Sequence, residues 1–173
     1  MPKPRRREAT SGRGAVLSFI ARCALYWGAS VWLVGRFRFI ERWGINLTVA
    51  TLDRVFAALG APAGRAGSAI TAGGANVNIV AECSPHMPFL IFAAAVLAFP
   101  ATWRQRLLGL MVGAALIHAF NTLRIMTLIW ILAWRSSWFD FVHVYLWQTG
   151  TVLVVFATFA LWLRLLARPS RSA

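Results

Sequence analysis

Long apolar runs are the feature that most constrains the fold of this chain. The stretches at residues 15–35, 86–103, 106–134 and 141–165 are dominated by apolar residues. A bilayer core about 30 Å thick requires about 20 such residues in an α-helix. Inside lipid, a helix satisfies its own backbone hydrogen bonds, which an open strand cannot do. The sequence therefore predicts an all-α integral membrane protein with about four transmembrane helices.

The composition and the placement of charge agree with a membrane protein. Of the 173 residues, 59% are hydrophobic and 13% are charged, whereas soluble domains carry about 25% charged residues. The net charge of +13 comes from basic residues that flank the apolar runs, as they do at the cytoplasmic ends of membrane helices. No basic patch is interleaved with aromatic residues, so we expect no nucleic-acid partner. The flanking basic residues include Lys3, Arg13, Arg104, Arg106 and Arg164.

Basic residues also predict the orientation of the chain. We expect residues 1–14 to form a disordered cytoplasmic tail, residues 15–166 a single transmembrane domain, and residues 167–173 a second cytoplasmic tail. The first apolar run follows a basic flank, as in a signal peptide, but it is too long and lacks a small-residue cleavage site. Both termini are therefore expected in the cytoplasm, with residues 36–85 as a loop outside.

The outer loop at residues 36–85 contains one helical pattern. Residues 45–61 place apolar residues at helical spacing around Asp53 and Arg54, which predicts an interfacial amphipathic helix. The segment 64–82 is rich in glycine and alanine and alternates only near its end. We expect a flexible loop or a short extended segment there.

The two cysteines have different surroundings in the sequence. Cys23 falls within the first apolar run and Cys83 in the outer loop, so a disulfide between them is not expected. No CxxC pair or Cys/His cluster has metal-ligand spacing, and we expect no metal and no cofactor. Cys23 is interpreted as a small buried apolar residue. Cys83 stands in the motif ECSPH and could be either such a residue or a nucleophile.

Two further polar residues fall at the same level as Cys83. Arg124 lies within the 106–134 run, roughly 15 Å from its outer end, and His143 lies just inside the outer end of 141–165. A charged residue inside a span costs at least roughly 2.5 kcal/mol and usually faces a cavity or a partner. We therefore predict that Cys83, Arg124 and His143 meet in one pocket at the outer face.

Neighbouring polar residues could support this site or replace parts of it. Asn121 lies one turn from Arg124 on nearly the same helix face, and could orient it or bind a substrate carbonyl. Arg124 could instead pair with Glu82 or Asp140 as a clamp between helices. Asp140 could also be the N-cap of the last span, or could orient His143.

The thiol and the imidazole have alternatives of their own. Cys83 precedes the first turn of a span, where the helix dipole and Arg124 stabilise a thiolate while the acidic neighbour of Cys83 opposes it. His143 could be a polar cap at the membrane interface. His86 is close to Cys83 in sequence and could serve as its base, whereas His118 lies about 120° around the helix from Arg124.

These elements resemble the exosortase/archaeosortase family of membrane cysteine transpeptidases. The resemblance runs from about residue 77 to residue 164 and rests on N-x-x-R at 121–124 and F-D-x-x-H at 139–143, on consecutive helices. Around the cysteine the family has a glycine-containing motif, where this chain has ECSPH. The segments most similar to the compact exosortase H branch are 96–109, 118–131 and 139–148.

The resemblance implies an activity, a substrate class and a location. Cys83 would be the nucleophile, Arg124 the cation that stabilises the oxyanion, and His143 the proton carrier of a cysteine endopeptidase or transpeptidase. Its substrates would be secreted proteins whose C-terminal sorting signal has a hydrophobic anchor and a basic tail. The enzyme would lie in the cell membrane as a multi-pass protein, in contact with the bilayer, with its active site on the external or periplasmic side.

Two other function classes were weighed against this one. The glutamate and proline around Cys83 favour a non-catalytic relative that binds sorting signals or acts as a scaffold in envelope assembly. A transporter is disfavoured, because its polar path would cross the bilayer and the polar residues here gather at one face.

Overall fold

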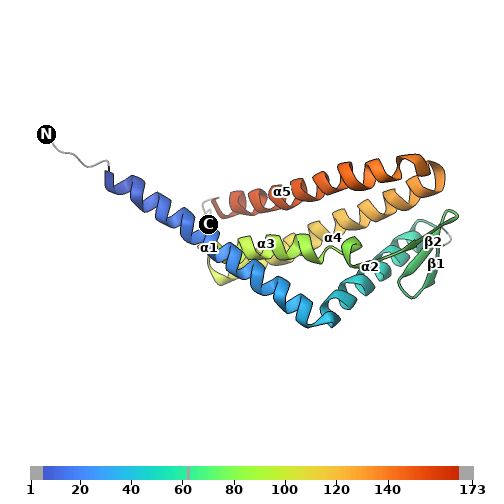
Figure 1. Ribbon diagram of the computed structural model, residues 1–173, viewed down its shortest axis with the longest axis horizontal. Coiled ribbons are helices and arrows are strands. Elements are labelled where there is room, and N and C mark those ends of the chain that lie inside the picture. The colour runs from blue at the N-terminus through green and yellow to red at the C-terminus, as the bar shows by residue number, and fades with distance from the viewer. Residues whose placement is uncertain (1–5, 62, 168–173) are drawn as a thin grey trace, which may run out of the picture.

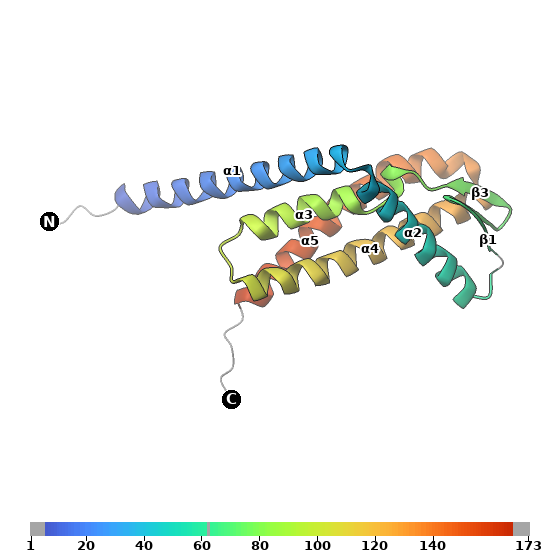
Figure 2. The same ribbon diagram turned by 90° about the horizontal axis from the view of Figure 1, so that it is seen from below.

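The structure is a computed structural model that describes residues 6–61 and 63–167. The chain is mostly helical, and its long helices run back and forth along one axis (Figure 1). The start of α1, the α3–α4 turn and the end of α5 lie at one end of the molecule, whereas α2 and a small sheet lie at the other (Figures 1 and 2). The helices are α1 (Arg6–Arg36), α2 (Arg38–Ala58), α3 (His86–Ala98), α4 (Trp103–Trp134) and α5 (Trp147–Ala167).

Three of the described helices are long and apolar enough to cross a membrane. They are Gly12–Arg36 within α1, Trp103–Trp134, which is α4, and Ser136–Ala167, which includes α5. The turn before α5 contains the 3-10 helix η2 (Ser136–Trp138) and the π-helix η3 (Phe141–Leu146). The expected multi-pass membrane protein thus has three helices of sufficient length, and the count of four crossings stays a prediction.

Helix α3 is shorter than the span expected at residues 86–103. It ends at Ala98, and Phe99 adopts an extended conformation with ψ 140. The reason is Pro100, which disfavours helical geometry at the preceding residue. The next helix then begins at Trp103 rather than at 106, because Thr102 and Gln105 form a reciprocal capping box.

The first helix begins earlier than expected. Helix α1 starts at Arg6, so the expectation of a disordered tail is wrong for residues 6–14. Residues 1–5 and the tail at 168–173 lie outside the described residues.

Helix α2 replaces the interfacial helix expected at 45–61, and it starts seven residues earlier and ends three residues earlier. One face is buried, with Val49 and Leu52 fully inaccessible to solvent. The opposite face exposes Phe39 and Trp43. This two-faced pattern is typical of a helix that lies between protein and the membrane interface.

The glycine-rich segment after α2 forms a sheet, so of the two alternatives the extended segment is right and the flexible loop is wrong, as is an all-α fold there. Its three antiparallel strands are ordered β1-β2-β3. Gly73 and Gly74 both have positive φ and link β2 to β3 by a two-residue turn, the geometry that suits a tight hairpin. The strands are β1 (Ala63–Ala66), β2 (Ala69–Ala72) and β3 (Ala75–Asn78).

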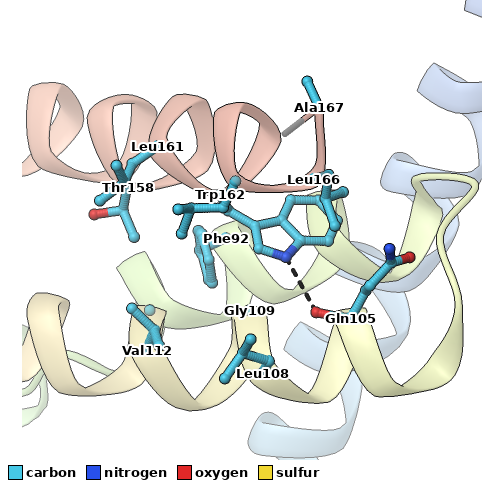
Figure 3. A pocket seen from close by; sticks show the side chains of 12 residues that line it. Phe92, Gln105, Leu108, Gly109, Val112, Thr158, Leu161, Trp162, Leu166 and Ala167 are labelled. Atoms are coloured by element: carbon cyan, nitrogen blue, oxygen red, sulfur yellow. Dashed lines mark hydrogen bonds between the residues drawn. The ribbon is translucent and has the colours of Figure 1, made fainter. Parts of the chain in front are cut away.

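Two apolar clusters hold these elements together. The first joins the buried face of α2 and the inner face of the sheet to Ile125 and Ile129 of α4. The second lies at the far end, where α3, α4 and α5 pack against one another (Figure 3). There Trp162 of α5 lies over Gly109 and donates its indole N–H to the Gln105 carbonyl at 3.1 Å (Figure 3). The first cluster supports the candidate site.

Candidate active site

Arg124 and His143 contact each other across the gap between α4 and the turn that precedes α5. The distance from Arg124 Nη2 to His143 Nε2 is 3.3 Å, and both side chains are half-buried. Guanidinium has only donors, so His143 Nε2 is the acceptor in this contact. In this contact the ring proton of His143 is therefore on Nδ1, and the Nε2 electron pair faces the Arg124 guanidinium.

The π-helix η3 positions His143. It covers Phe141–Leu146 and is continuous with α5. A π-turn inserts an extra residue into a helix, and such turns are frequent at functional sites. The imidazole also stacks on Phe139, with ring centroids 5.4 Å apart. Both features restrict the rotation of the His143 side chain.

In the described structure, Asp140 takes none of the three roles considered from the sequence, which were N-cap of the last span, partner of Arg124 and hydrogen-bond partner of His143. Its backbone is already helical, with φ −64 and ψ −42, and its side chain makes no capping hydrogen bond. Asp140 is exposed, and among the described residues it neither bonds to His143 nor pairs with Arg124. The expected N-cap is wrong because the helical turn begins before Asp140.

The Cys83 loop, which is the segment 79–85 between β3 and α3, lies against α4. Cys83 ends the 3-10 turn η1 (Ala81–Cys83), and its carbonyl accepts a hydrogen bond of 2.8 Å from Asn121 Nδ2. Asn121 is only 5% exposed. Cys83 is half-buried and lies within Coulombic range of the Arg124 guanidinium. The structure thus brings Cys83, Asn121, Arg124 and His143 to one region.

Helix α2 contacts the same loop from another side. A Cβ placed on Gly44 would lie 2.6 Å from Ser84 Oγ and 3.9 Å from His86 Cβ. Ser84 is 4% exposed, and its hydroxyl has no partner among the described residues. The close approach explains why α2 has no side chain at residue 44.

His86 and Glu82 lie beside this contact. His86 is the first residue of α3, and its buried Nδ1 has no partner in the described part of the chain. Glu82 is exposed, and together with Glu41 of α2 it lies within Coulombic range of His86. Among residues 6–61 and 63–167, Glu82 forms no ion pair with Arg124, so the expected clamp between helices is absent from the described structure.

His118 and Cys23 point to other parts of the molecule. His118 Nε2 lies 2.9 Å from Thr51 Oγ1, which joins α4 to α2. Cys23 is on α1, and its Sγ faces the Ala94 carbonyl of α3 at 4.0 Å. Within the described residues, no three His, Cys, Asp or Glu side chains are grouped as a metal centre requires.

Comparison with known families decides what kind of protein carries this site. The family model of transmembrane exosortase (exosortase EpsH) matches residues 9–163. The chain belongs to the transmembrane exosortase family. No curated protein and no solved structure matches it. The family expected from the N-x-x-R and F-D-x-x-H elements is confirmed, whereas the exosortase H branch stays a prediction.

Exosortases are, as a family, membrane proteins of protein sorting and cysteine transpeptidases. In this exosortase, the N-x-x-R element forms one turn of α4, in which Asn121 binds the Cys83 loop and Arg124 contacts His143. The F-D-x-x-H element lies in the turn that leads into α5. Each element therefore presents a polar side chain to the same region.

The contact between α2 and the Cys83 loop in this exosortase was not predicted from the sequence. Gly44 gave no signal, because a single glycine in an amphipathic pattern has no unique interpretation. Phe120 and Trp147 were also missed. Their ring centroids lie 5.3 Å apart, and the two residues stand four positions before Arg124 and four after His143, respectively, in the sequence.

Proposed function

We propose that this exosortase is a cysteine endopeptidase or transpeptidase that cleaves C-terminal sorting signals of secreted proteins at the outer membrane face. The observation that carries the proposal is the 3.3 Å contact between Arg124 Nη2 and His143 Nε2 beside the Cys83 loop. A thiol, a fixed cation and a neutral base together supply the nucleophile, the charge stabilisation and the proton transfer that acyl transfer requires.

In the first step, His143 acts as the base. Arg124 first releases His143 Nε2, whose electron pair then takes the thiol proton of Cys83, directly or through one water. The thiolate attacks the scissile carbonyl carbon, a C–S bond forms, and the carbonyl oxygen becomes an oxyanion. Arg124 exchanges its contact with His143 for one with this oxyanion. Such fixed donors contribute a few kcal/mol to the transition state.

In the second step, His143 acts as the acid. The imidazolium gives its proton to the leaving amine, the C–N bond breaks, and the substrate remains on Cys83 as a thioester. An amine or water then attacks the thioester and loses a proton to His143. The sulfur leaves as thiolate, which recovers its proton from His143, so the cycle is closed without a cofactor.

The arrangement of the helices supports a membrane topology for this chemistry. The start of α1, the α3–α4 turn and the end of α5 share one end (Figure 1), where we place the cytoplasm because Arg104, Arg106 and Arg164 are there. Helix α3, with 13 residues, spans only about 20 Å. It contacts α1, α4 and α5, so we propose that it serves as the fourth crossing inside a shell of longer helices.

The substrate class that the family resemblance implies fits the depth of the site. Arg124 lies inside a span, so the scissile bond must reach into the outer part of the bilayer. A secreted protein held by a hydrophobic C-terminal anchor with a basic tail brings its peptide to that depth. The basic tail would remain with the cytoplasmic end, in keeping with the usual distribution of charge.

Expression with reporter substrates tests the proposal. Each reporter is a secreted protein fused to an apolar C-terminal helix and basic tail from the host's own anchored proteins. Wild type should shorten at least one reporter, and Cys83→Ala should leave it at full length. A thioester-linked complex of enzyme and reporter, which dithiothreitol and hydroxylamine cleave, should accumulate only when Cys83 is present.

The same experiment separates the rival function. A sorting-signal-binding relative would be recovered with the reporter from both wild type and Cys83→Ala, and the reporter would keep its full length in both. That result across the panel would contradict the enzymatic proposal and support the scaffold.

A further inference from the structure

The backbone of the Cys83 loop is held on two sides by helices that are not adjacent to it in the sequence. On the α4 side, Asn121 Nδ2 donates 2.8 Å to the Cys83 carbonyl. On the α2 side, the bare backbone of Gly44 leaves room for Ser84, whose Oγ would lie 2.6 Å from a Cβ at residue 44. The loop is therefore confined at Cys83 itself and at the next residue.

The side-chain amide of Asn121 is hydrogen-bonded to the backbone of Cys83. Its N–H contacts the Cys83 carbonyl, and the side chain is 5% exposed. A buried polar group keeps such a bond because leaving a partner unsatisfied costs about 1–3 kcal/mol. This contact differs from the two roles that the sequence allowed, namely orienting Arg124 or binding a substrate carbonyl.

Asn121 and Arg124 are fixed relative to each other by the helix. Residues three apart lie on nearly one face, about 4.5 Å along the axis. At one end of this helical turn Asn121 bonds to the backbone of Cys83, and at the other end Arg124 carries the guanidinium. One turn of α4 thus connects the backbone of Cys83 to the residue that carries the guanidinium.

We infer that Asn121 is a positioning residue, which fixes the position of the Cys83 sulfur relative to Arg124. On the opposite side, the backbone of Gly44 limits how far the loop can move toward α2. The inference rests on the proposed function, since it assigns the parts that make the proposed nucleophile competent. The first test below uses a small alkylating reagent, so it does not depend on the substrate.

The first test measures alkylation of Cys83 by iodoacetamide in a Cys23→Ala background. The thiolate is the reacting form, so the rate reports the proximity of the Arg124 cation. Asn121→Leu keeps a similar volume but removes the donor, and it should lower the rate about tenfold, as removal of one specific interaction of this size would. Thr122→Val is the matched control, because Thr122 is also buried and its hydroxyl bonds only to the His118 carbonyl of its own helix.

A double variant separates positioning from a general loss of structure. In an Arg124→Ala background the cation is absent, so Asn121→Leu should change the alkylation rate by less than about twofold. An equal fall in both backgrounds would mean that Asn121 serves only the fold, and would overturn the inference. A wild-type rate in Asn121→Leu would overturn it as well.

A substitution on the opposite side provides a second variant. Gly44→Ala should push Ser84 and the loop away from α2, with a loss of alkylation that again depends on Arg124. Gly28→Ala is its control, because a Cβ there meets nothing within 4 Å. A wild-type rate in Gly44→Ala would contradict the stop at residue 44.

Reporter cleavage then links the inference to the function. If wild type cleaves a reporter, Asn121→Leu should slow cleavage about 10- to 100-fold, since small misplacements of reacting groups have effects of that size. If no reporter is cleaved but alkylation still depends jointly on Asn121 and Arg124, the positioning role stands and the proposed enzymatic function fails.

Discussion

Arg124 donates to His143 over 3.3 Å, and this contact joins the middle of α4 to the π-turn that begins α5. It gives the guanidinium a partner in a part of the chain where a lone charge would be costly. It also leaves Arg124 Nε buried and without a partner among the described residues.

Replacement of Arg124 by lysine should abolish most of the activity. A lysine ammonium is a compact charge without the planar fork of guanidinium, so it cannot present a fixed pair of donors to the oxyanion. We expect reporter cleavage to fall about 100- to 1000-fold, the effect of removing one oxyanion donor. Timed immunoblots of the reporter measure the rate, and Arg22→Lys in α1 is the control. Cleavage by Arg124→Lys within a few-fold of wild type would contradict the assigned role.

The histidines should separate by function. His143→Ala removes the proposed proton carrier and should slow reporter cleavage at least about 100-fold. His118→Ala removes only the bond between α4 and Thr51 of α2, and should lower stability by about 0.5–1.5 kcal/mol. Cleavage and thermal unfolding are measured on the same preparations. If His118→Ala cleaved the reporter more slowly than His143→Ala, the assignment of His143 as the proton carrier would be wrong.

The two cysteines should differ in accessibility from outside the cell. Cys83 lies in the loop end of the molecule, whereas Cys23 lies on α1 against α3. A membrane-impermeant maleimide added to intact cells should label Cys83 at least about tenfold faster, because only a hydrated thiol ionises and reacts readily. Single-cysteine variants provide the comparison. Labelling of Cys83 only after the cells are broken would place the site on the cytoplasmic side.

The packing of α3 against α4 should depend on Gly113. A Cβ there would clash with the ring of Phe92, which is fully buried. We expect Gly113→Val to destabilise the protein by about 1–3 kcal/mol through overpacking, while Gly28→Val leaves the unfolding temperature unchanged. Thermal unfolding in detergent measures both variants. Equal unfolding temperatures would show that α3 adjusts its position freely.

The sequence predicted the elements whose signal is local and failed where the signal was weak. Helix α4 was predicted to within three residues, and the run at 141–165 agrees with η3 and α5 taken together, because about 20 apolar residues leave the chain little choice in a bilayer. The three-stranded sheet was not predicted beyond a possible extended segment, since its strands are four residues long and half of their residues are alanine or glycine, which have low strand propensity. The Gly73-Gly74 pair was the available signal for a tight turn.

By itself, the sequence determined that the chain is a membrane protein, and its N-x-x-R and F-D-x-x-H elements determined the family. Both properties depend on residue type and short spacing, which the sequence displays directly. Only the tertiary structure decided that Asn121 holds the Cys83 backbone, that Arg124 turns to His143 rather than to Glu82, and that Gly44 closes the opposite side. These contacts join residues 19 to 40 positions apart in the sequence. Their geometry follows from how helices pack, which no local pattern encodes.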